Sequence, residues 1–476
     1  MMQSIADVIS HVYQSTIFLY GLVLLLVYAM LALFSMLAVR QYARKNNDYQ
    51  LDVLAGSGIV PGITVLAPAY NEGPTIIDNV RSLLTLNYPR FEIVVINDGS
   101  TDDTLEQLIR EFSLQEVDFA YHIKLKTQPV KRVYKSADPA YSTLVVLDKV
   151  NGKSKADASN AGINAASFDY FLCTDVDCVL DKNTLLELIR PVLQEEKKRV
   201  IATGATLRIG NSCEFDEGVM VRMRPPRQLL PRFQEVEYIR SFVLGKMGWS
   251  YINCVPNVSG GLGLFDKEVA IRCGGYDHTS FGEDMELMSR MCRYAYDYNI
   301  DYAIRYIPKT LCWTEAPNTL TIFKRQRIRW ARGLAQLIHA HFHMFLNPKY
   351  GKIGMIIFPY NFFFELLGPV VEMTGLIIYL LLALLGYIHW HNALWLLLFV
   401  YTYSIMITTI AILWDQLTFR YYKTWKEVAF LCMTAFLEFV IYHPVIVFFS
   451  LRGYYYFLTG KQVSWGNMQR QGFGKK

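Results

Sequence analysis

The apolar residues of this chain are distributed unevenly, and this distribution is the strongest constraint on its fold. Hydrophobic residues make up 52% and charged residues 19% of the 476 positions, which is apolar for a soluble protein of this length. The apolar residues gather in one N-terminal block and one longer C-terminal block, and a mixed polar region separates them. We therefore expect a polar domain that lies between membrane helices.

The N-terminal block, Thr16–Val39, contains no charged residue. About 20 apolar residues suffice to cross the hydrocarbon core of a bilayer. A cleaved signal peptide is the alternative, but residues 1–15 contain no Lys or Arg, and the run is longer than a signal h-region. Arg40, Arg44 and Lys45 follow directly, so the positive-inside rule places the chain from residue 40 onward in the cytosol. We expect a retained anchor whose N-terminus lies outside.

The C-terminal block contains two segments that are suited to crossing a membrane, Val370–Leu385 and Ala393–Leu413. An aromatic-rich segment, Ile353–Leu367, precedes them and contains Pro359 and Glu365. Because a proline and a charge disfavour a span, we expect this segment to lie along the membrane interface.

A further apolar segment, Val428–Phe449, carries Glu438 and the pair His443-Pro444. Charged groups inside a span are costly, so we predict that this segment is broken, re-entrant or interfacial near these residues. A cytosolic tail requires an even number of crossings after the polar domain. The tail is basic, which favours the cytosol, through Lys461, Arg470, Lys475 and Lys476.

The charge balance and the cysteines exclude some classes of function. The net charge of +5 is modest and no basic motif is present, so we expect no nucleic-acid partner. The eight cysteines form no CxxC pair and no paired metal-binding spacing. Most of them fall in the region expected to be cytosolic, where free thiols are usual, and we expect them to be structural.

The polar region, from about Gly62 to Leu346, alternates between strand and helix patterns. This alternation predicts a parallel or mostly parallel sheet, with a ligand crevice beyond the carboxyl ends of its strands. The expected strands are Ile63–Ala67, Phe91–Ile96, Leu144–Leu147 and Tyr170–Thr174, and the expected helices are Thr75–Leu86, Asp102–Phe112 and Asp157–Ala166.

Polar clusters follow three of these strands. Tyr70-Asn71-Glu72 follows the first, and Asn97-Asp98-Gly99-Ser100 follows the second, although either cluster alone is ordinary turn chemistry. Asp175 and Asp177 leave the strand that ends at Thr174. Two carboxylates at this spacing can turn toward one ligand, and Mg²⁺ or Mn²⁺ commonly bridges such carboxylates to substrate phosphates. A solvated acidic turn is the alternative.

A fourth cluster, Gly282-Glu283-Asp284, precedes the helical pattern Met285–Arg293. A carboxylate at a helix start often serves only as a cap, which contributes about 1 kcal/mol. It can also act as a general base that takes the proton of a hydroxyl group.

A fifth element, Gln326-Arg327-Ile328-Arg329-Trp330, precedes the C-terminal apolar block. In this order the five elements resemble the family-2 glycosyltransferases with a GT-A fold. The resemblance is closest to the membrane-integrated, processive synthases of cellulose, hyaluronan and poly-N-acetylglucosamine, and the fifth element resembles their QxxRW signature. It covers the chain from Ile63 to about Gly472.

The resemblance implies an α/β fold in which a GT-A-type, Rossmann-like nucleotide-sugar domain is inserted between N- and C-terminal transmembrane helices. The implied parts are the anchor at 1–44, a cytosolic GT-A domain at 45–317, interfacial helices that include QxxRW at 318–367, and a membrane region with a cytosolic tail at 368–476. It also implies a multi-pass protein of the cell membrane, in bacteria the inner membrane.

For the donor, the resemblance implies that Tyr70 and Glu72 lie near the nucleotide base and that Asp98 contacts uridine. Lys155 and Asp157 fall in a segment, Lys153–Asn160, that resembles GGKADALN beside the nucleotide. Ser and Lys replace the usual glycines there, which puts the close backbone approach in doubt. Asp175 and Asp177 would hold Mg²⁺ or Mn²⁺ on the diphosphate, with Asp177 the more direct ligand.

For the acceptor, Asp284 resembles the catalytic base of the TED motif, in which Gly282 replaces the usual Thr. The tail segment Lys461–Gly466 resembles a C-terminal gating segment with a WG pair, although a basic interfacial anchor is the alternative. Arg329 would stabilise the departing diphosphate, and Trp330 would stack on the acceptor sugar unless it is a core aromatic. The remaining residues implied near substrate are Ser259, Gly260, Gly261, Glu283, Gln326 and Trp465.

The implied reaction is direct displacement with inversion, in which a sugar passes from a nucleotide-sugar, UDP-linked by this resemblance, to a growing polysaccharide with coupled export. A divalent ion and an Arg would neutralise the leaving diphosphate, and one base suffices, unlike the two carboxylates of a glycoside hydrolase. Transfer of one sugar to a glycolipid or polyprenyl phosphate is an alternative, because QxxRW also occurs in some glycolipid transferases. A non-catalytic membrane receptor is a third hypothesis. An accessory membrane subunit is compatible with each.

Overall fold

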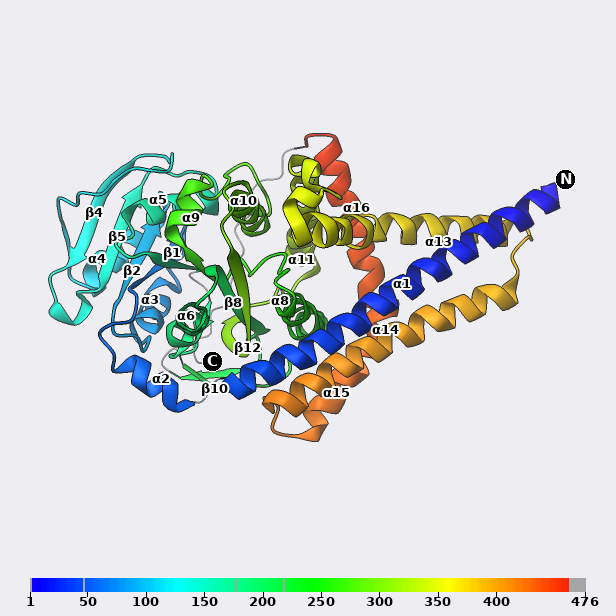
Figure 1. Cartoon of the computed structure of the whole chain (residues 1–476), viewed down its shortest axis with the longest axis horizontal. Coiled ribbons are helices and arrows are strands. Elements are labelled where there is room, and N and C mark those ends of the chain that lie inside the picture. The colour runs from blue at the N-terminus through cyan, green and yellow to red at the C-terminus, as the bar shows by residue number, and fades with distance from the viewer. Residues whose placement is uncertain (1, 46–47, 176–177, 217–218, 462–476) are drawn as a thin grey trace. The chain divides into compact units, whose positions relative to one another are not determined.

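The computed structural model describes residues 2–45, 48–175, 178–216 and 219–461 (Figure 1). These residues form two compact units. The first, here called the sheet unit, comprises 37–226 and 249–316, and the second, the helical unit, comprises 2–36, 227–248 and 317–461. The segment 227–248 lies within the polar region by sequence, yet it belongs to the helical unit.

The sheet unit is built on a ten-stranded mixed sheet with the order β3-β4-β5-β2-β1-β6-β11-β8-β12-β7. A separate two-stranded ribbon is formed by β9 and β10. The strands are β1 (Ile63–Ala69), β2 (Phe91–Asn97), β3 (Leu114–Glu116), β4 (Val130–Ser136), β5 (Leu144–Lys149), β6 (Tyr170–Thr174), β7 (Val179–Leu180), β8 (Arg199–Ile209), β9 (Glu214–Asp216), β10 (Val219–Arg222), β11 (Leu262–Asp266) and β12 (Tyr302–Thr314).

The four strands expected from sequence are confirmed as β1, β2, β5 and β6, and they pair in parallel. The rest of the sheet is mixed, so the prediction of a mostly parallel sheet is only partly correct: β8 and β12 also pair in parallel, but the other pairs are antiparallel. β4 runs antiparallel to β5, and β11 runs antiparallel to both β6 and β8. Buried strands read as the same apolar runs in either direction, so sequence pattern alone did not reveal these reversals.

Helices cover this sheet, and the three expected ones are confirmed as α3, α4 and α5. Nearly every residue of α5 is buried, and its small side chains allow close packing on β1 and β2. A Cβ added at Gly162 would lie 2.9 Å from Leu66 and 3.0 Å from Ile96. The helices of this unit are α2 (Asp48–Ala55), α3 (Ile76–Leu84), α4 (Thr104–Glu111), α5 (Lys155–Ala165), α6 (Thr184–Gln194), α8 (Met247–Tyr251), α9 (Lys267–Arg272) and α10 (Glu283–Asp297).

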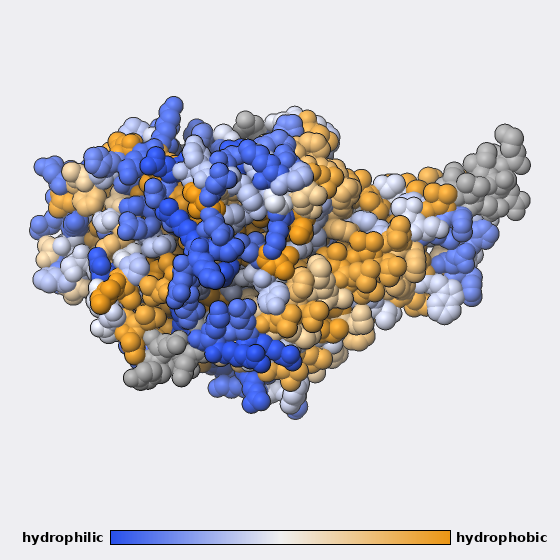
Figure 2. Space-filling view, in the orientation of Figure 1, coloured by the Kyte–Doolittle hydropathy of each residue, from blue (hydrophilic) through white to orange (hydrophobic). Residues whose placement is uncertain are grey.

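The helical unit contains most of α1 and all of the later long helices. Among the described residues, four helical runs are long and apolar enough to cross a membrane: His11–Lys45, Ile353–Leu384, Trp390–Phe419 and Trp425–Leu458. Figure 2 shows apolar side chains gathered over the surface of these helices. The helices are α1 (Met2–Lys45), α7 (Leu229–Ile239), α11 (Leu320–Ala340), α12 (Phe358–Tyr360), α13 (Gly368–Leu384), α14 (Trp390–Phe419), α15 (Trp425–Leu437) and α16 (His443–Leu458), with π-helical turns η2 (Arg240–Lys246), η5 (Ile353–Ile357), η6 (Asn361–Leu366) and η7 (Glu438–Tyr442).

The chain stays helical across the expected break near Glu438, but a π-helical turn interrupts the α-helical pattern there, and a re-entrant or interfacial position stays a prediction. α15 continues through the π-helical turn η7 into α16, which carries Pro444 in its first turn, where a missing N–H is tolerated. The Glu438 carboxylate is buried, but the Arg240 guanidinium lies 2.8 Å from it. Thr408 Oγ1 also donates to Glu438 at 3.1 Å. This paired charge does not force the helix to end.

The segment Ile353–Leu367 was expected to be a separate interfacial stretch. In the structure it is helical and runs on into α13, so that the combined run extends over 32 residues.

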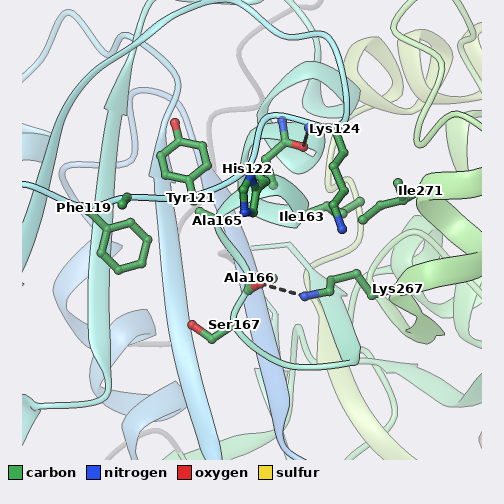
Figure 3. Close-up of a pocket in the computed structure, with 12 residues that line it drawn as sticks. Phe119, Tyr121, His122, Lys124, Ile163, Ala165, Ala166, Ser167, Lys267 and Ile271 are labelled. Atoms are coloured by element: carbon green, nitrogen blue, oxygen red, sulfur yellow. Dashed lines mark hydrogen bonds between the residues drawn. The ribbon is translucent and has the colours of Figure 1, made fainter.

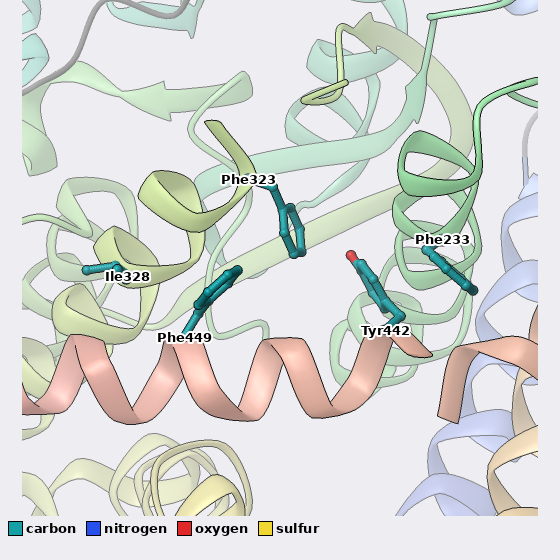
Figure 4. Packing of buried hydrophobic residues seen from close by; sticks show 5 residues of the cluster. All are labelled: Phe233, Phe323, Ile328, Tyr442 and Phe449. Carbon is teal, nitrogen blue, oxygen red and sulfur yellow. The ribbon is translucent and has the colours of Figure 1, made fainter. Parts of the chain in front are cut away.

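An aromatic cluster joins helices of this unit that are far apart in sequence (Figure 4). Phe233 stacks on Tyr442 at 5.0 Å between ring centroids, and Phe323 contacts the same ring at 5.4 Å. Ile328 and Phe449 complete the cluster. The cluster therefore fixes α7, α11 and α16 against one another.

Candidate active site

The carboxyl ends of β2 and β5 and the first turn of α5 meet around one buried cation. The Lys149 ammonium is fully buried and lies 2.5 Å from Asp98 and 2.6 Å from Asp157. It also donates to the carbonyl of Val150 at 2.7 Å, while the Gly152 amide donates to Asp98 at 3.0 Å. Asp98 and Asp157, which sequence reasoning placed at the nucleotide, are thus brought together by one lysine.

Sequence reasoning did not select Lys149, although a signal was available. The residue ends β5, a strand that is buried at every position. A lysine is almost never fully buried without a partner, so its position already required acidic neighbours.

The loops after β1 and β2 are tied together beside this cluster. The Asn71 amide donates to Ser100 Oγ at 3.0 Å, and the Thr101 amide donates to the Asn71 side-chain oxygen at 2.8 Å. Tyr70 is 42% exposed, so its ring is free to meet a ligand. Gly99 adopts a φ of 65°, and a Cβ there would lie 2.8 Å from the Asn151 amide nitrogen. This turn therefore requires glycine.

The two substitutions that put the loop before α5 in doubt are accommodated. Lys153 adopts a φ of 57°, the left-handed conformation that a glycine enters without cost. Ser154 caps α5, because its side chain accepts a hydrogen bond from the Asp157 amide at 3.2 Å. The backbone path is retained at the cost of some strain at Lys153.

Lys155 lies at the start of α5 and contacts the Asp175 carboxylate. Its ammonium also donates to the Gly260 carbonyl at 2.7 Å. Burial alone would lower the pKa of Lys155, but the charge and hydrogen bond of Asp175, together with Cys173 and Glu283, raise this pKa above its ordinary value. Lys155 is therefore a permanent positive charge beside Asp175.

A glycine pair, Gly260-Gly261, brings one loop close to two carboxylates. A Cβ added at Gly260 would lie 3.7 Å from Asp284 Oδ2, and one at Gly261 would lie 3.5 Å from Asp175 Oδ2. Both are ordinary contact distances, so larger side chains would fill the space beside these oxygens. Ser259 precedes the pair in this loop.

Asp284 lies in the first turn of α10 and is partly exposed, whereas Glu283 beside it is buried. The side-chain amide of Asn257 donates a hydrogen bond to Asp284 Oδ2 at 3.2 Å. Sequence reasoning missed Asn257, since a lone asparagine before Ser259 carries no motif. The loop that holds it is anchored by Asn253, which donates to the Tyr302 carbonyl and accepts from the Ile304 amide at 2.8 Å.

The candidate metal ligands are only partly described. Asp175 directly follows β6, while Asp177 lies outside the described residues. Within the described ranges, no group of three or more His, Cys, Asp or Glu side chains is arranged to hold a metal ion.

The QxxRW residues lie on α11 in the helical unit, and Gln326, Arg329 and Trp330 are each partly buried. Arg327, inside the motif, was not predicted to matter. Its guanidinium makes two hydrogen bonds of 2.6 Å with Glu237, and its central carbon lies 4.6 Å from the centre of the Trp330 ring.

Arg327 also donates to the Tyr442 hydroxyl at 2.9 Å, so it joins α11 to α7 and to η7. The tail residue Trp465 lies outside the described residues.

Comparison with known families agrees with this arrangement. Residues 64–211 match the model of glycosyl transferase family 2, and residues 228–423 match that of glycosyl transferase family group 2. The chain belongs to the family-2 glycosyltransferases. The first match covers the strands from β1 to β8, and the second covers the chain from α7 to α14.

Among curated relatives, the chain is similar to poly-beta-1,6-N-acetyl-D-glucosamine synthases. It is 29% identical over 299 residues to one from Staphylococcus epidermidis, covering 63% of this chain and 61% of that protein. It is 27% identical over 320 residues to one from Staphylococcus aureus strain COL, covering 67% and 64%. The matched part therefore spans less than two thirds of the length of these relatives.

Among solved structures, the chain is similar to a mannosyltransferase, PcManGT from Pyrobaculum calidifontis in complex with GDP-Man and Mn²⁺. That match has 18% identity and a TM-score of 0.49, and it covers 87% of this chain and 99% of the other.

Proposed function

We propose that this family-2 glycosyltransferase is an inverting membrane enzyme that adds N-acetylhexosamine from a UDP-linked donor to a growing polysaccharide. The observation that carries the proposal is the convergence of Asp175, Lys155 and Asp284 on one glycine loop, Gly260-Gly261. The curated relatives support the sugar class and the polymeric product, since both are named as poly-beta-1,6-N-acetyl-D-glucosamine synthases.

In this proposal the donor lies at the carboxyl ends of β1, β2 and β5. Tyr70, which is exposed, offers its ring to the base, with Glu72 beside it. Lys149 and Gly152 occupy one oxygen of Asp98, which leaves the other for the uracil. Asp157 completes this charge cluster through the same lysine.

The diphosphate would lie beside Asp175, with the undescribed Asp177 as the more direct ligand of Mg²⁺ or Mn²⁺. A bound divalent ion would neutralise charge that develops on the leaving diphosphate. Lys155 contributes a fixed positive charge and orients Asp175. The Arg329 guanidinium would add a further positive charge.

Asp284 would act as the general base. It takes the proton of the acceptor hydroxyl while that oxygen bonds to the anomeric carbon, and the bond between this carbon and the diphosphate oxygen breaks. Attack opposite the leaving group inverts the configuration. Asn257 holds one Asp284 oxygen, and the small residues from Ser259 to Gly261 leave room for a sugar.

Trp330 is proposed to stack on the acceptor sugar, as the family resemblance implies. An aromatic face suits the apolar side of a pyranose ring, and the Arg327 guanidinium lies over the Trp330 ring at 4.6 Å from its centre. Glu283, Gln326 and Trp465 are proposed to contact substrate, as the family resemblance implies.

We further propose that the protein lies in the bacterial inner membrane and that its catalytic domain, residues 45–317, is cytosolic. The other proposed parts are the anchor at 1–44, the QxxRW-bearing helices at 318–367 and a membrane region from 368 onward. The basic tail favours the cytosol, which requires that only two of the three C-terminal candidate spans cross. A periplasmic reporter fused after Lys476 tests this arrangement. Activity of that reporter would contradict a cytosolic tail and any gating role of Trp465.

The enzymatic proposal is tested with the purified full chain, UDP-N-acetylglucosamine and Mg²⁺ or Mn²⁺. We expect polymeric product by size analysis and loss of at least about 10³-fold in turnover for Asp284→Asn, with UDP binding retained. Addition of a single sugar to a lipid would contradict the proposal that the product is a polymer. Unchanged turnover in Asp284→Asn would contradict the proposed role of Asp284 as the general base.

A further inference from the structure

A cavity of about 210 Å³ lies at the far end of α5 from Lys155 (Figure 3). Its walls are the loop 119–124, the C-terminal end of α5 with the residues after it, and two residues of α9, Lys267 and Ile271. Helical rise places this end of α5 roughly 12–15 Å from Lys155. The cavity is therefore separate from the proposed donor site.

The cavity has fixed walls. Asn164, near the end of α5, accepts hydrogen bonds from the Lys124 and Leu125 amides at 3.0 and 2.9 Å, and donates to the Leu125 carbonyl at 2.8 Å. On the other side, the Lys267 amide donates to the Asp169 carbonyl at 2.9 Å. The backbone of the loop and that of α9 are thus both held by hydrogen bonds.

Two ammonium groups face this cavity without a directly bonded carboxylate. Lys267 donates to the Ala166 carbonyl at 2.8 Å, which uses one of its three N–H donors. Within the described residues, no carboxylate oxygen lies within 4.0 Å of the ammonium of Lys124 or Lys267. Burial lowers the pKa of Lys267, the more distant Asp169 and Glu92 oppose this, and the charge of Lys124 lowers it further.

Aromatic rings form the opposite wall. In Figure 3, Lys124, Lys267 and Ile271 lie on one side of the cavity, Phe119 and Tyr121 lie on the other, and His122 lies between them. The Phe119 and Tyr121 rings are 6.0 Å apart. Burial raises the pKa of Tyr121, whose hydroxyl is already neutral at physiological pH and can donate a hydrogen bond.

We propose that this cavity binds a small, soluble phosphate ester that carries a planar ring. The phosphate would lie between Lys124 and Lys267, since two facing cations with unused donors match an anion with several acceptor oxygens. The ring would lie against Phe119 and Tyr121, since a flat apolar group suits aromatic faces. The proposal does not depend on the sugar, the acceptor or the reaction.

Phenyl phosphate is the probe, and the full chain in detergent with EDTA is the sample, so that metal-dependent binding at the donor site does not contribute. Calorimetry should show one saturable site that also binds inorganic phosphate about threefold to tenfold more weakly. Lys124→Met and Lys267→Met should each weaken phenyl phosphate at least about tenfold. The matched control is Lys126→Met, because Lys126 is exposed and does not line the cavity.

A ring-wall variant separates the two parts of the ligand. Phe119→Ala should weaken phenyl phosphate but leave inorganic phosphate unchanged. Lys124 is exposed, and within the described part of the chain its side chain makes no hydrogen bond or ion pair, so its variant keeps the test valid if Lys267→Met fails to fold. The proposal is overturned by no saturable binding to the native chain, by native affinity in Lys124→Met, or by displacement of phenyl phosphate by phosphatidic acid micelles, which would assign the site to lipid headgroups.

Discussion

Replacing Lys149 with methionine should destabilise the sheet unit strongly. The substitution keeps the length of the side chain and removes the only charge that lies between Asp98 and Asp157 among the described contacts. Both carboxylates are nearly buried, with side-chain exposures of 8% and 11%. Leaving a buried charge without its partner costs about 3–5 kcal/mol, and here two charges lose the same partner.

For a unit of this size, each kcal/mol lost from the free energy of unfolding lowers the melting temperature by about 2–4 °C. We therefore expect the melting temperature to decrease by about 6–20 °C. Thermal unfolding in detergent, followed by intrinsic fluorescence, measures the change. Lys131→Met is the matched control, because Lys131 lies on β4 and is exposed. It should unfold within about 2 °C of the native chain, as surface substitutions usually do.

A triple variant separates charge from packing. Lys149→Met combined with Asp98→Asn and Asp157→Asn removes both unpaired charges, so it should unfold at a higher temperature than Lys149→Met alone. The reasoning is refuted if Lys149→Met melts with the native chain, or if the triple variant is no more stable than the single one.

Three further results are expected. Asn257→Ala should lower turnover about tenfold, because Asp284 loses its orienting donor, while UDP affinity measured by calorimetry stays unchanged; equal turnover would contradict this role. Burial raises the pKa of Glu237, but Arg327 and Tyr442 outweigh it and lower this pKa below its ordinary value. A carboxyl group whose pKa is lower in the folded than in the unfolded protein contributes stability above its ordinary pKa near 4.5, and this contribution is lost as the pH falls through the folded-state pKa. In denaturant titrations, the free energy of unfolding of the native chain should therefore exceed that of Glu237→Gln by less at pH 4 than at pH 7. A difference that does not change with pH would refute the linkage. Chelation by EDTA should abolish sugar transfer, and Mg²⁺ or Mn²⁺ should restore it in a radiolabel assay, whereas full activity in EDTA would exclude the proposed metal.

Local patterns predicted the elements that hold the site, because each depends on a short stretch of sequence. Short apolar runs that end in turn residues located β1, β2 and β6, together with the acidic residues that follow them. The direction of β11 and β4 was not predictable in this way, since strand pairing depends on partners elsewhere in the chain.

The residues that sequence reasoning missed share one property: their partners are distant in sequence. Lys149 meets Asp98 from 51 residues away, and Asn257 meets Asp284 from 27 residues away. The same property applies to the pairing of Glu438, whose charge is paired by a residue 198 positions earlier. Motifs identify residue types, whereas burial and charge pairing become visible only when the chain is folded.

The pairing of Arg240 with Glu438 also sets an order for biogenesis. Synthesis at about 5–20 residues per second means that roughly 10–40 s pass between the emergence of the two side chains. During that interval Arg240 lacks the Glu438 carboxylate, so packing of the segment 227–248 against the apolar helices would bury an unpaired charge. We therefore expect the helical unit to close only after η7 has emerged. A chain whose synthesis stops before Glu438 would leave the Arg240 guanidinium without this carboxylate.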